Sequence, residues 1–409
     1  MKQNLHTFIM ALLTLFSIYL YFLSATPLPK QQINIKIAPL INVASEEKQA
    51  LTYLNQLRVG AGLVPFQAQK QLTIAAKNHA NYLTHHFKYG HQEKSTDKDF
   101  TGEFASSRIT YAGYASPQVI ENVSTHNHNY KESIDGLFSA IYHRFAFLDF
   151  RSDAIGIGIS QSKYSRTQTS FVYDMSSNAL EELYKSNAPI SSKGIDKALN
   201  KNKRLNSKVV IYPFNQQKDV PPAFFDELPD PLPEHKVSGF PISISFNSFY
   251  YKEAKLLNFQ LFNAEGVEIT NCIKLDKQTD PNQRLGSLDF VLFPLKRLKW
   301  DSEYSVKFLA IIDKKIIEKK WHFHTRTFAL PFHTVNSEKK LFTLKKSHSY
   351  VFYFPPTSKV DLLSDIAYPT SFDIDFIDKN TIKLTALELV KRPIKLKIGK
   401  HLLRVNITQ

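Results

Sequence analysis

The sequence predicts an α+β domain followed by two all-β regions. Residues 46–180 mix amphipathic helical segments with apolar strand-like segments, without regular alternation of strand and helix. This mixture favours a layered α+β arrangement over a doubly wound parallel sheet. From Gly239 onward, short runs alternate apolar and polar residues and are separated by Gly and Asp. Such alternation is typical of β-strands that bury one face.

Three helices are expected in the first region. From Glu46 to Val59, leucines recur at near-helical spacing, and a Gly60-Ala61-Gly62 break follows. The second helix, Gln69 to Phe87, places its leucines and alanines on one side. The third, Ser133 to Leu148, is apolar enough to be largely buried.

Two strands and a linker follow these helices. Ala154 to Ile159 is strand-like, and Thr169 to Tyr173 is expected to be its neighbour. Residues 183–207 are rich in Lys, Asn and Ser, which indicates a linker. Five prolines keep the next segment extended, namely Pro221, Pro222, Pro229, Pro231 and Pro233. We therefore expect a basic and Pro-rich linker over residues 181–238.

The remaining chain is expected to be all β. Residues 239–329 carry alternating runs that predict a β-sandwich, at 242–246, 258–262 and 304–308. Residues 330–409 predict a smaller β domain, with strands near 350–354, 371–376, 382–387 and 402–407. No catalytic cluster is recognisable in this last region.

Residues 1–27 have the composition of an export segment. Lys2 precedes an uncharged run rich in Phe, Leu and Ile, from Thr7 to Ala25. The run is close to the roughly 20 residues that span a bilayer, whereas Leu23 suits a cleavage site after Ala25 poorly. A cleaved signal peptide and an uncleaved inner-membrane anchor both stay open. Either one exports the remaining chain to the periplasm or the extracellular space.

The net charge and the cysteine count indicate the class of binding partner and the compartment of this chain. Lys and Arg number 52 against 37 Asp and Glu, a net charge of +15. This charge favours an anionic envelope component or lipid, although a solvated basic surface is the simpler explanation. No nucleic-acid module is recognisable, and membrane contact is expected only through the N-terminal segment. Cys272 is the only cysteine, so the chain relies on packed cores, as suits a bacterial envelope protein.

Two histidines and a glutamate stand in separate short motifs. The motifs are Gly90-His91, Glu121-Asn122 and Tyr142-His143-Arg144. Neutral imidazole donates a lone pair and carboxylate supplies charge, so this set suits either metal ligation or proton transfer.

The order and spacing of these motifs resemble the CAP superfamily of cysteine-rich secretory, antigen 5 and pathogenesis-related proteins, in its bacterial secreted form. The resemblance begins at Asn55-Gln56-Leu57-Arg58, includes Ala75-Ala76-Lys77-Asn78-His79-Ala80, and ends at Ile155-Gly156-Ile157-Gly158. It implies that residues 46–180 form a three-layer α-β-α sandwich. Residues 239–329 similarly resemble bacterial immunoglobulin-like modules, which implies an immunoglobulin-like β-sandwich before the small C-terminal domain.

The family cleft holds two His and usually two Glu. By resemblance, His91 and His143 match the two histidines and Glu121 matches the first glutamate, with Arg144 beside them in the ligand cleft. The second glutamate is missing, because Leu137-Phe138-Ser139-Ala140 occupies its place. Its absence weighs against any mechanism that needs two carboxylates.

The chemistry of this set leaves a few alternatives open. His91, His143, Glu121 and a water would give zinc four ligands, so a divalent metal such as zinc is the one cofactor considered. Glu121 is the candidate acid or base. Arg108 is expected to be structural, paired with a buried carbonyl or carboxylate.

Three functions follow from these expectations. The first is an exported module that binds a lipid or another envelope component in the His/Glu cleft. The second is a metal-dependent hydrolase of peptide or envelope polymer that uses His91, Glu121 and His143. The third is a structural or adhesion role of the β regions. Ligand identity, enzymatic activity and oligomeric state are not determined by the sequence.

Overall fold

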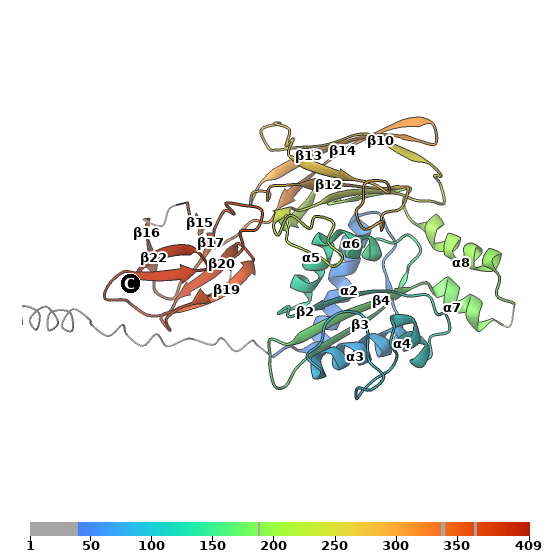
Figure 1. Cartoon of the computed structure of the whole chain (residues 1–409), viewed down its shortest axis with the longest axis horizontal. Helices are drawn as coiled ribbons and strands as arrows, with labels where there is room; N and C mark the ends of the chain where they lie inside the picture. Colours follow the sequence, from blue (N-terminus) through green and yellow to red (C-terminus); the bar gives the residue numbers. More distant parts are fainter. Residues whose placement is uncertain (1–39, 187–188, 337–339, 364–365) are drawn as a thin grey trace, which may run out of the picture. The chain divides into compact units, whose positions relative to one another are not determined.

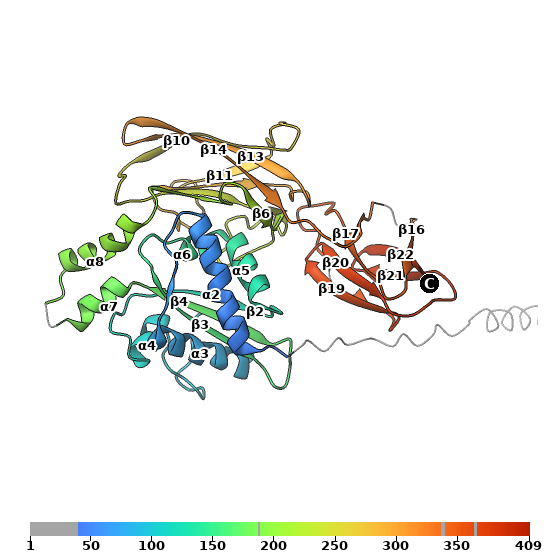
Figure 2. The same cartoon turned by 180° about the vertical axis from the view of Figure 1, so that it is seen from behind.

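The computed structural model describes residues 40–186, 189–336, 340–363 and 366–409 (Figures 1 and 2). These residues form two compact units: residues 40–329 with Pro356–Leu362, and Leu330–Pro355 with Leu363–Gln409. The predicted export segment lies outside the described residues. Among the helices that are described, none has both the length and the apolar character needed to cross a membrane.

A four-stranded sheet lies at the centre of the first region. Its strand order is β1-β3-β4-β2, and only the β1–β3 pair is parallel. The strands are β1 Gln67–Ala68, β3 Ala154–Gln161, β4 Thr169–Ser176 and β2 Ile120–Thr125. β2 is an edge strand, and its side chains alternate between the two faces of the sheet.

Helices cover both faces of this sheet (Figures 1 and 2). One face carries α2 Val43–Gly60, α5 Tyr130–Ser139 and α6 Ile141–Phe147, and the other carries α3 Lys70–His85 and α4 Ala105–Tyr111. Successive side chains of β3 point to opposite faces of the sheet, which explains both cores. Ile155 and Ile157 pack with α2 and α5, whereas Ala154 packs with α3. The helices predicted over 46–59 and 69–87 and the strands predicted over 154–159 and 169–173 are confirmed within a few residues at each end.

Two glycines let α3 lie directly on β3. A Cβ atom on Gly156 would lie 2.0 Å from the carbonyl carbon of Leu72, and one on Gly158 would lie 2.2 Å from that of Ala76. Only glycine permits so close an approach of helix backbone to strand backbone. The Ile-Gly-Ile-Gly motif therefore encodes one helix–sheet contact.

Two expectations from the sequence were wrong in detail. The helix expected over 133–148 breaks at Ala140, whose extended ψ of 114° separates α5 from α6. The segment expected as a linker contains the end of α7 Asn178–Lys185 and the whole of α8 Ser192–Leu205. Asn202 of α8 is buried and donates to the carbonyl of Arg151, so tertiary contacts hold this Lys-rich helix in place.

Two further sheets complete the first unit. One has the order β11-β12-β9-β5 and the other β10-β13-β14-β6, and aromatic residues such as Phe246, Phe259 and Phe308 join them into one core. The first sheet contains β5 Val209–Tyr212, β9 Ile242–Phe246, β11 Cys272–Leu275 and β12 Asp289–Pro294. The second contains β6 Gln217–Val220, β10 Ala254–Phe262, β13 Glu303–Ile312 and β14 Lys315–Thr325. A small hairpin pairs β7 Ala223–Phe224 with β8 Ser238–Gly239. The immunoglobulin-like assignment stays a prediction.

Polar contacts join the helical region to these sheets. Arg326 donates to Asp135 of α5 at 2.6 Å and to Asp219 at 2.7 Å. Tyr53 of α2 donates to the same Asp135 at 2.5 Å. Together with the shared apolar core, these contacts make the two regions one unit.

The second unit is all β in its described part. It contains two four-stranded sheets, ordered β15-β17-β20-β19 and β16-β22-β21-β18. The first has β15 Phe332–Thr334, β17 Ser349–Tyr353, β19 Phe372–Asp378 and β20 Thr381–Ala386. The second has β16 Leu341–Lys345, β18 Ile366–Ala367, β21 Ile394–Ile398 and β22 His401–Thr408. A separate apolar core, including Phe352, Leu384 and Val405, holds it together.

Candidate functional site

His91 and Glu121 form a pair on the α3–α4 face of the sheet. His91 follows Gly90, whose φ of +92° turns the loop after α3 toward β2. The Nδ1 atom of His91 lies 2.9 Å from Oε1 of Glu121. The imidazole is 51% exposed, whereas the carboxylate of Glu121 is only 3% exposed. The pair therefore presents a ring to solvent and keeps its charge partner buried.

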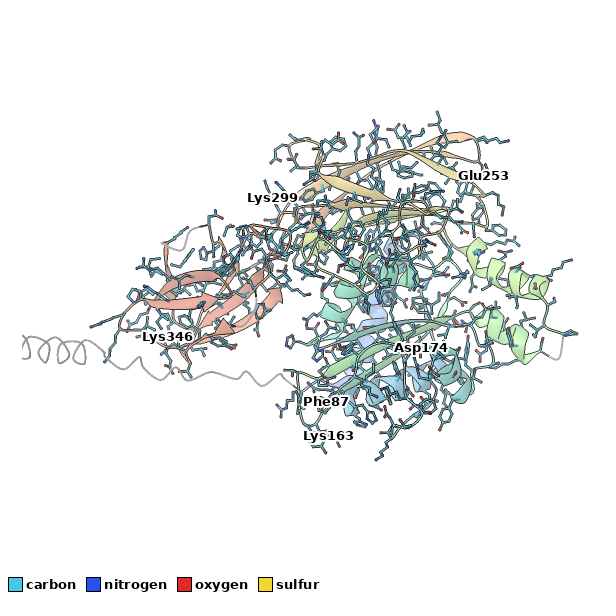
Figure 3. All side chains as sticks on the ribbon, viewed as in Figure 1. Phe87, Lys163, Asp174, Glu253, Lys299 and Lys346 are labelled. Carbon is cyan, nitrogen blue, oxygen red and sulfur yellow. The ribbon has the colours of Figure 1, made fainter. Side chains whose placement is uncertain are left out.

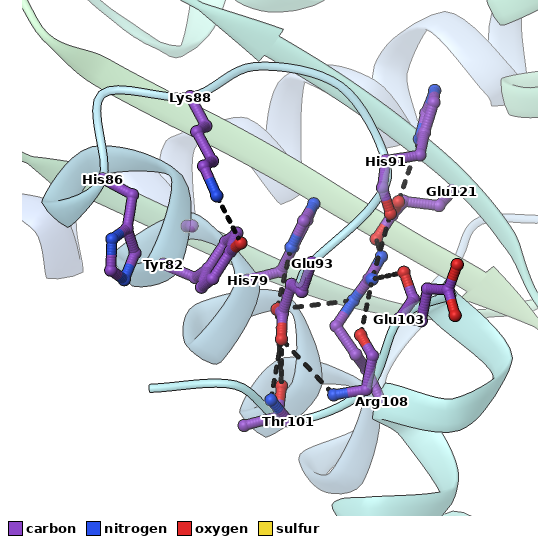
Figure 4. A network of polar contacts seen from close by, with 12 residues as sticks. His79, Tyr82, His86, Lys88, His91, Glu93, Thr101, Glu103, Arg108 and Glu121 are labelled. Carbon is purple, nitrogen blue, oxygen red and sulfur yellow. Dashed lines mark hydrogen bonds and ion pairs between the residues drawn. The ribbon is translucent and has the colours of Figure 1, made fainter. Parts of the chain in front are cut away.

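Arg108 of α4 holds Glu121 from the buried side. Its Nη2 donates to Oε2 of Glu121 at 2.6 Å, and Figure 4 shows Glu121 between His91 and Arg108. Its Nη1 donates to the carbonyl oxygens of His91, Gly102 and Glu103. Burial works to raise the pKa of Glu121, but the hydrogen bond with His91 and the charge of Arg108 outweigh it and lower that pKa. Glu121 is therefore ionised, and Arg108 has the structural role expected of it.

Asp174 is a second carboxyl group at this site that the sequence analysis missed. It lies on β4 directly opposite Glu121 in the ladder, and Figure 3 labels it inside the domain. It is fully buried, and among the described residues no donor reaches either of its carboxyl oxygens. Burial and the negative charge of Glu121 raise the pKa of Asp174 well above its ordinary value, against the opposing effect of Arg108. This raised pKa favours the protonated form of Asp174 beside the ionised Glu121.

A neighbouring network shapes the loop that carries His91. His79 of α3 is buried, with Nδ1 3.0 Å from Oε1 of Glu93 and Nε2 3.1 Å from the carbonyl oxygen of Gly90. Glu93 also accepts from the backbone N–H of Thr101 at 2.7 Å, as Figure 4 shows. Burial opposes ionisation, but the contacts with His79 and Thr101 and the nearby charge of Arg108 lower the pKa of Glu93. These contacts set the position of His91 before any ligand arrives.

His143 pairs with a carboxylate from outside the predicted domain. Its Nδ1 lies 2.9 Å from Oε2 of Glu227, which is 84 residues further along the chain. Glu227 also accepts from the backbone N–H groups of Ile141 at 2.6 Å and Tyr142 at 3.2 Å. The ring of His143 is only 16% exposed. Burial raises the pKa of Glu227 despite these hydrogen bonds, so its ionised form depends on His143 and the helix N–H groups.

Glu227 supplies a second carboxylate beside a motif histidine, His143, the same chemical group as the glutamate that is missing from the family position. No local pattern in the Pro-rich segment marks it, because it is one of several acidic residues there. The sequence offered one indirect clue to Glu227: the family glutamate near His143 is absent, which leaves room for a carboxylate from another part of the chain.

The other two residues of the Tyr-His-Arg motif also contact the β region. Tyr142 donates its hydroxyl to Asp280. Arg144 is fully buried and donates to the carbonyl oxygens of Phe138 at 2.6 Å and Pro241 at 2.7 Å. The placement of Arg144 in the ligand cleft is therefore corrected: its guanidinium joins α6 to the β region, where solvent does not reach it.

The predicted group of three side chains does not assemble. Glu121 faces α3 and α4, whereas the next residue on β2, Asn122, donates to the carbonyl oxygen of His143 at 2.9 Å on the other face. Successive side chains of a strand alternate, so His91 and His143 approach β2 from opposite sides. Within the described ranges, no three His, Cys, Asp or Glu side chains come together as metal ligands. The side chains present do not fit the proposed zinc site.

Comparison with known proteins identifies the helical region. The family model of the cysteine-rich secretory protein family, CAP, matches residues 51–174, so this part of the chain is a CAP domain, as the motifs indicated. No curated protein matches the chain. An extracellular SCP-domain protein from Bacillus anthracis is similar at 13% identity and a TM-score of 0.29, over 34% of this chain and 44% of that one. An outer surface protein from Borrelia burgdorferi is similar at 16% identity and a TM-score of 0.30, over 34% of this chain and 97% of that one.

Proposed function

We propose that this chain is an exported envelope protein whose CAP domain binds a ligand at His91. The observation that carries the proposal is the contrast within one pair: the ring is 51% exposed and its carboxylate 3%. A buried carboxylate that holds Nδ1 fixes the tautomer and the orientation of the ring. The ring is thus ordered before binding, which lowers the entropic cost of association.

The free nitrogen of His91 defines the chemistry of the contact. In the neutral ring with Nδ1–H donating to ionised Glu121, Nε2 carries the lone pair and accepts a hydrogen bond. A ligand group that fits this acceptor is a hydroxyl or an ammonium. Arg108 stabilises this arrangement from the buried side, because its cation favours the charge on Glu121.

The surface beside His91 suits an amphiphilic ligand. Tyr89, two residues earlier in the same loop, is an exposed aromatic residue. An aromatic ring offers apolar contact area next to the hydrogen-bonding imidazole. We therefore assign the head group of an envelope lipid as the ligand, in a protein whose residues 7–25 have the composition of an export segment.

The test is a titration of the full chain with short-chain phosphatidylglycerol below its micelle concentration. The glycerol head group of this lipid supplies hydroxyl donors. His91→Ala is expected to raise Kd about tenfold, because loss of one hydrogen bond at an ordered site costs about 1–1.5 kcal/mol. An unchanged Kd in this variant, or no binding by the wild-type chain, would contradict the proposal.

His85 provides a matched control. It is also an exposed histidine whose Nδ1 contacts a carboxylate, Asp99, at 3.2 Å, but that carboxylate is itself exposed. His85→Ala should leave Kd unchanged. An equal loss in both variants would show that any surface histidine contributes, and the assignment to His91 would be wrong.

A further inference from the structure

Three segments that are far apart in the sequence meet at one end of the CAP domain. Because Gly156 faces Leu72 and Gly158 faces Ala76, α3 runs beside β3 and ends near the turn between β3 and β4. The backbone N–H of Ile41, just before α2, donates to the side chain of Gln161 at the end of β3, at 3.0 Å. Figure 3 shows Phe87 and Lys163 at this end of the domain.

This end exposes large apolar side chains together with cations. Leu40, Phe87 and Tyr164 are exposed, and Tyr164, at the tip of the β3–β4 turn, is 94% exposed. Lys163 and Arg166 flank Tyr164 and are also exposed. In the part of the chain that the structure describes, neither of these two cations forms an ion pair. We call these five residues the aromatic-basic edge.

Aromatic rings flanked by Lys and Arg are typical of side chains at a membrane interface. The rings occupy the head-group layer, and the cations contact lipid phosphates. The nearby acidic groups Asp97 and Asp99 contact Lys88 and His85, so they do not neutralise the two cations of the turn.

A second apolar segment precedes Leu40 in the sequence. Leu40 stands fifteen positions after Ala25, the end of the uncharged run that begins at Thr7. Fifteen residues reach at most about 50 Å when extended. A bilayer that holds residues 7–25 therefore lies within reach of the aromatic-basic edge.

We propose that the aromatic-basic edge lies on an anionic phospholipid bilayer. Phe87 and Tyr164 enter the head-group layer, while Lys163 and Arg166 bind phosphates. This contact uses other residues than the His91 site, although Phe87 and His91 share the loop after α3, and it extends membrane contact beyond the N-terminal segment. It orients the domain, because one end of the α-β-α sandwich faces the lipid.

A depth measurement on the full chain tests the proposal. In a Cys272→Ser background, a polarity-sensitive fluorophore is attached at Tyr164→Cys, and in a second protein at Val267→Cys. Val267 is an exposed control residue between β10 and β11, far from the edge in sequence. The chain is reconstituted in phosphatidylcholine vesicles with one quarter phosphatidylglycerol, and the lipids carry brominated acyl chains as quenchers.

The label at position 164 is expected to be quenched roughly twofold or more, because an interfacial side chain lies close to the acyl chains. The label at position 267 should remain unquenched. Equal, weak quenching at both positions overturns the proposal, whether or not residues 7–25 anchor the chain.

A charge variant tests the anionic lipid. Lys163→Glu combined with Arg166→Glu should lower the ratio of protein with a membrane-bound edge to protein with a free edge at least about fivefold. Each cation near an anionic membrane surface contributes about 1 kcal/mol. Vesicles of phosphatidylcholine alone should give the same reduction for the wild-type edge. Full quenching in vesicles of phosphatidylcholine alone would overturn the inference that Lys163 and Arg166 require anionic lipid. Far-UV circular dichroism spectra that match the wild type show that the variants fold.

Discussion

The two histidine–carboxylate pairs differ in exposure and in origin. His91 and Glu121 both belong to the CAP domain, and the ring is 51% exposed. His143 is 16% exposed, and its partner Glu227 comes from the segment after that domain. Both pairs have the same Nδ1–carboxylate distance of 2.9 Å.

The same chemical pair therefore serves two purposes. At His91 the carboxylate orients a ring that can still meet a ligand. At His143 the carboxylate also accepts from two helix N–H groups, and the neighbouring Tyr142 and Arg144 contact the β region. We interpret the second pair as a docking contact between the CAP domain and the β sheets. The following predictions test this division, from the largest effect to the smallest.

Arg108→Ala should destabilise the first unit most. The change leaves Glu121 buried without its cation and three carbonyl oxygens without their donor, which is expected to cost about 3–5 kcal/mol. Urea unfolding measures the loss. Arg151→Ala, which removes a more exposed cation paired with Asp149, should cost less than about 1 kcal/mol. Equal losses would mean that burial of the Glu121 pair has no energetic weight.

Glu227→Ala should reduce stability by about 2–3 kcal/mol, because His143 and two backbone N–H groups lose their acceptor. Glu227→Gln keeps an acceptor for the helix and should lose less. Titration with short-chain phosphatidylglycerol should give the wild-type Kd for both variants. A tenfold weaker Kd would make Glu227 part of the ligand site and remove the distinction between the two pairs.

Asp174→Asn should change how stability depends on pH. The pKa of Asp174 in the folded chain lies above its unfolded value of about 3.9, so the folded state binds the extra proton between these two values. The contribution of Asp174 to stability is therefore present at low pH and is lost as pH rises above about 4. Asn has no such proton, so the variant should gain stability relative to the wild type as pH increases.

The measurement is a series of urea unfolding curves between pH 2 and pH 8. Glu121→Gln should behave in the opposite sense, since the lowered pKa of Glu121 stabilises the fold above about pH 4 and that effect is lost in acid. A constant difference between wild type and Asp174→Asn across the range would refute the protonated state of Asp174.

His91→Ala should have the smallest effect on stability, within about 0.5 kcal/mol, because the ring is half exposed. Its effect on the Kd for short-chain phosphatidylglycerol should nevertheless be the largest of these variants. Differential scanning calorimetry and the titration measure the two quantities. A large loss of stability would make His91 a structural residue like His143.

Local patterns predicted much of the CAP domain. The leucine and alanine spacing of residues 69–87 predicted α3, and the glycine-isoleucine alternation predicted β3. These features are read from neighbouring residues, because helix and strand periodicity repeat over a few positions. The break at Ala140 and the helix α8 were not predicted, since packing of Asn202 and its neighbours outweighs a composition typical of a linker.

The sequence by itself determined the residue types of the site: two histidines, one glutamate in its family position, and an absent second glutamate. Tertiary structure decided how they are used. It placed His91 and His143 on opposite sides of β2, brought Glu227 to His143 across 84 residues, buried Arg144, and set Asp174 against Glu121. The reason is physical: side-chain facing, burial and the resulting pKa values depend on which distant segments pack together, and no local pattern encodes that choice.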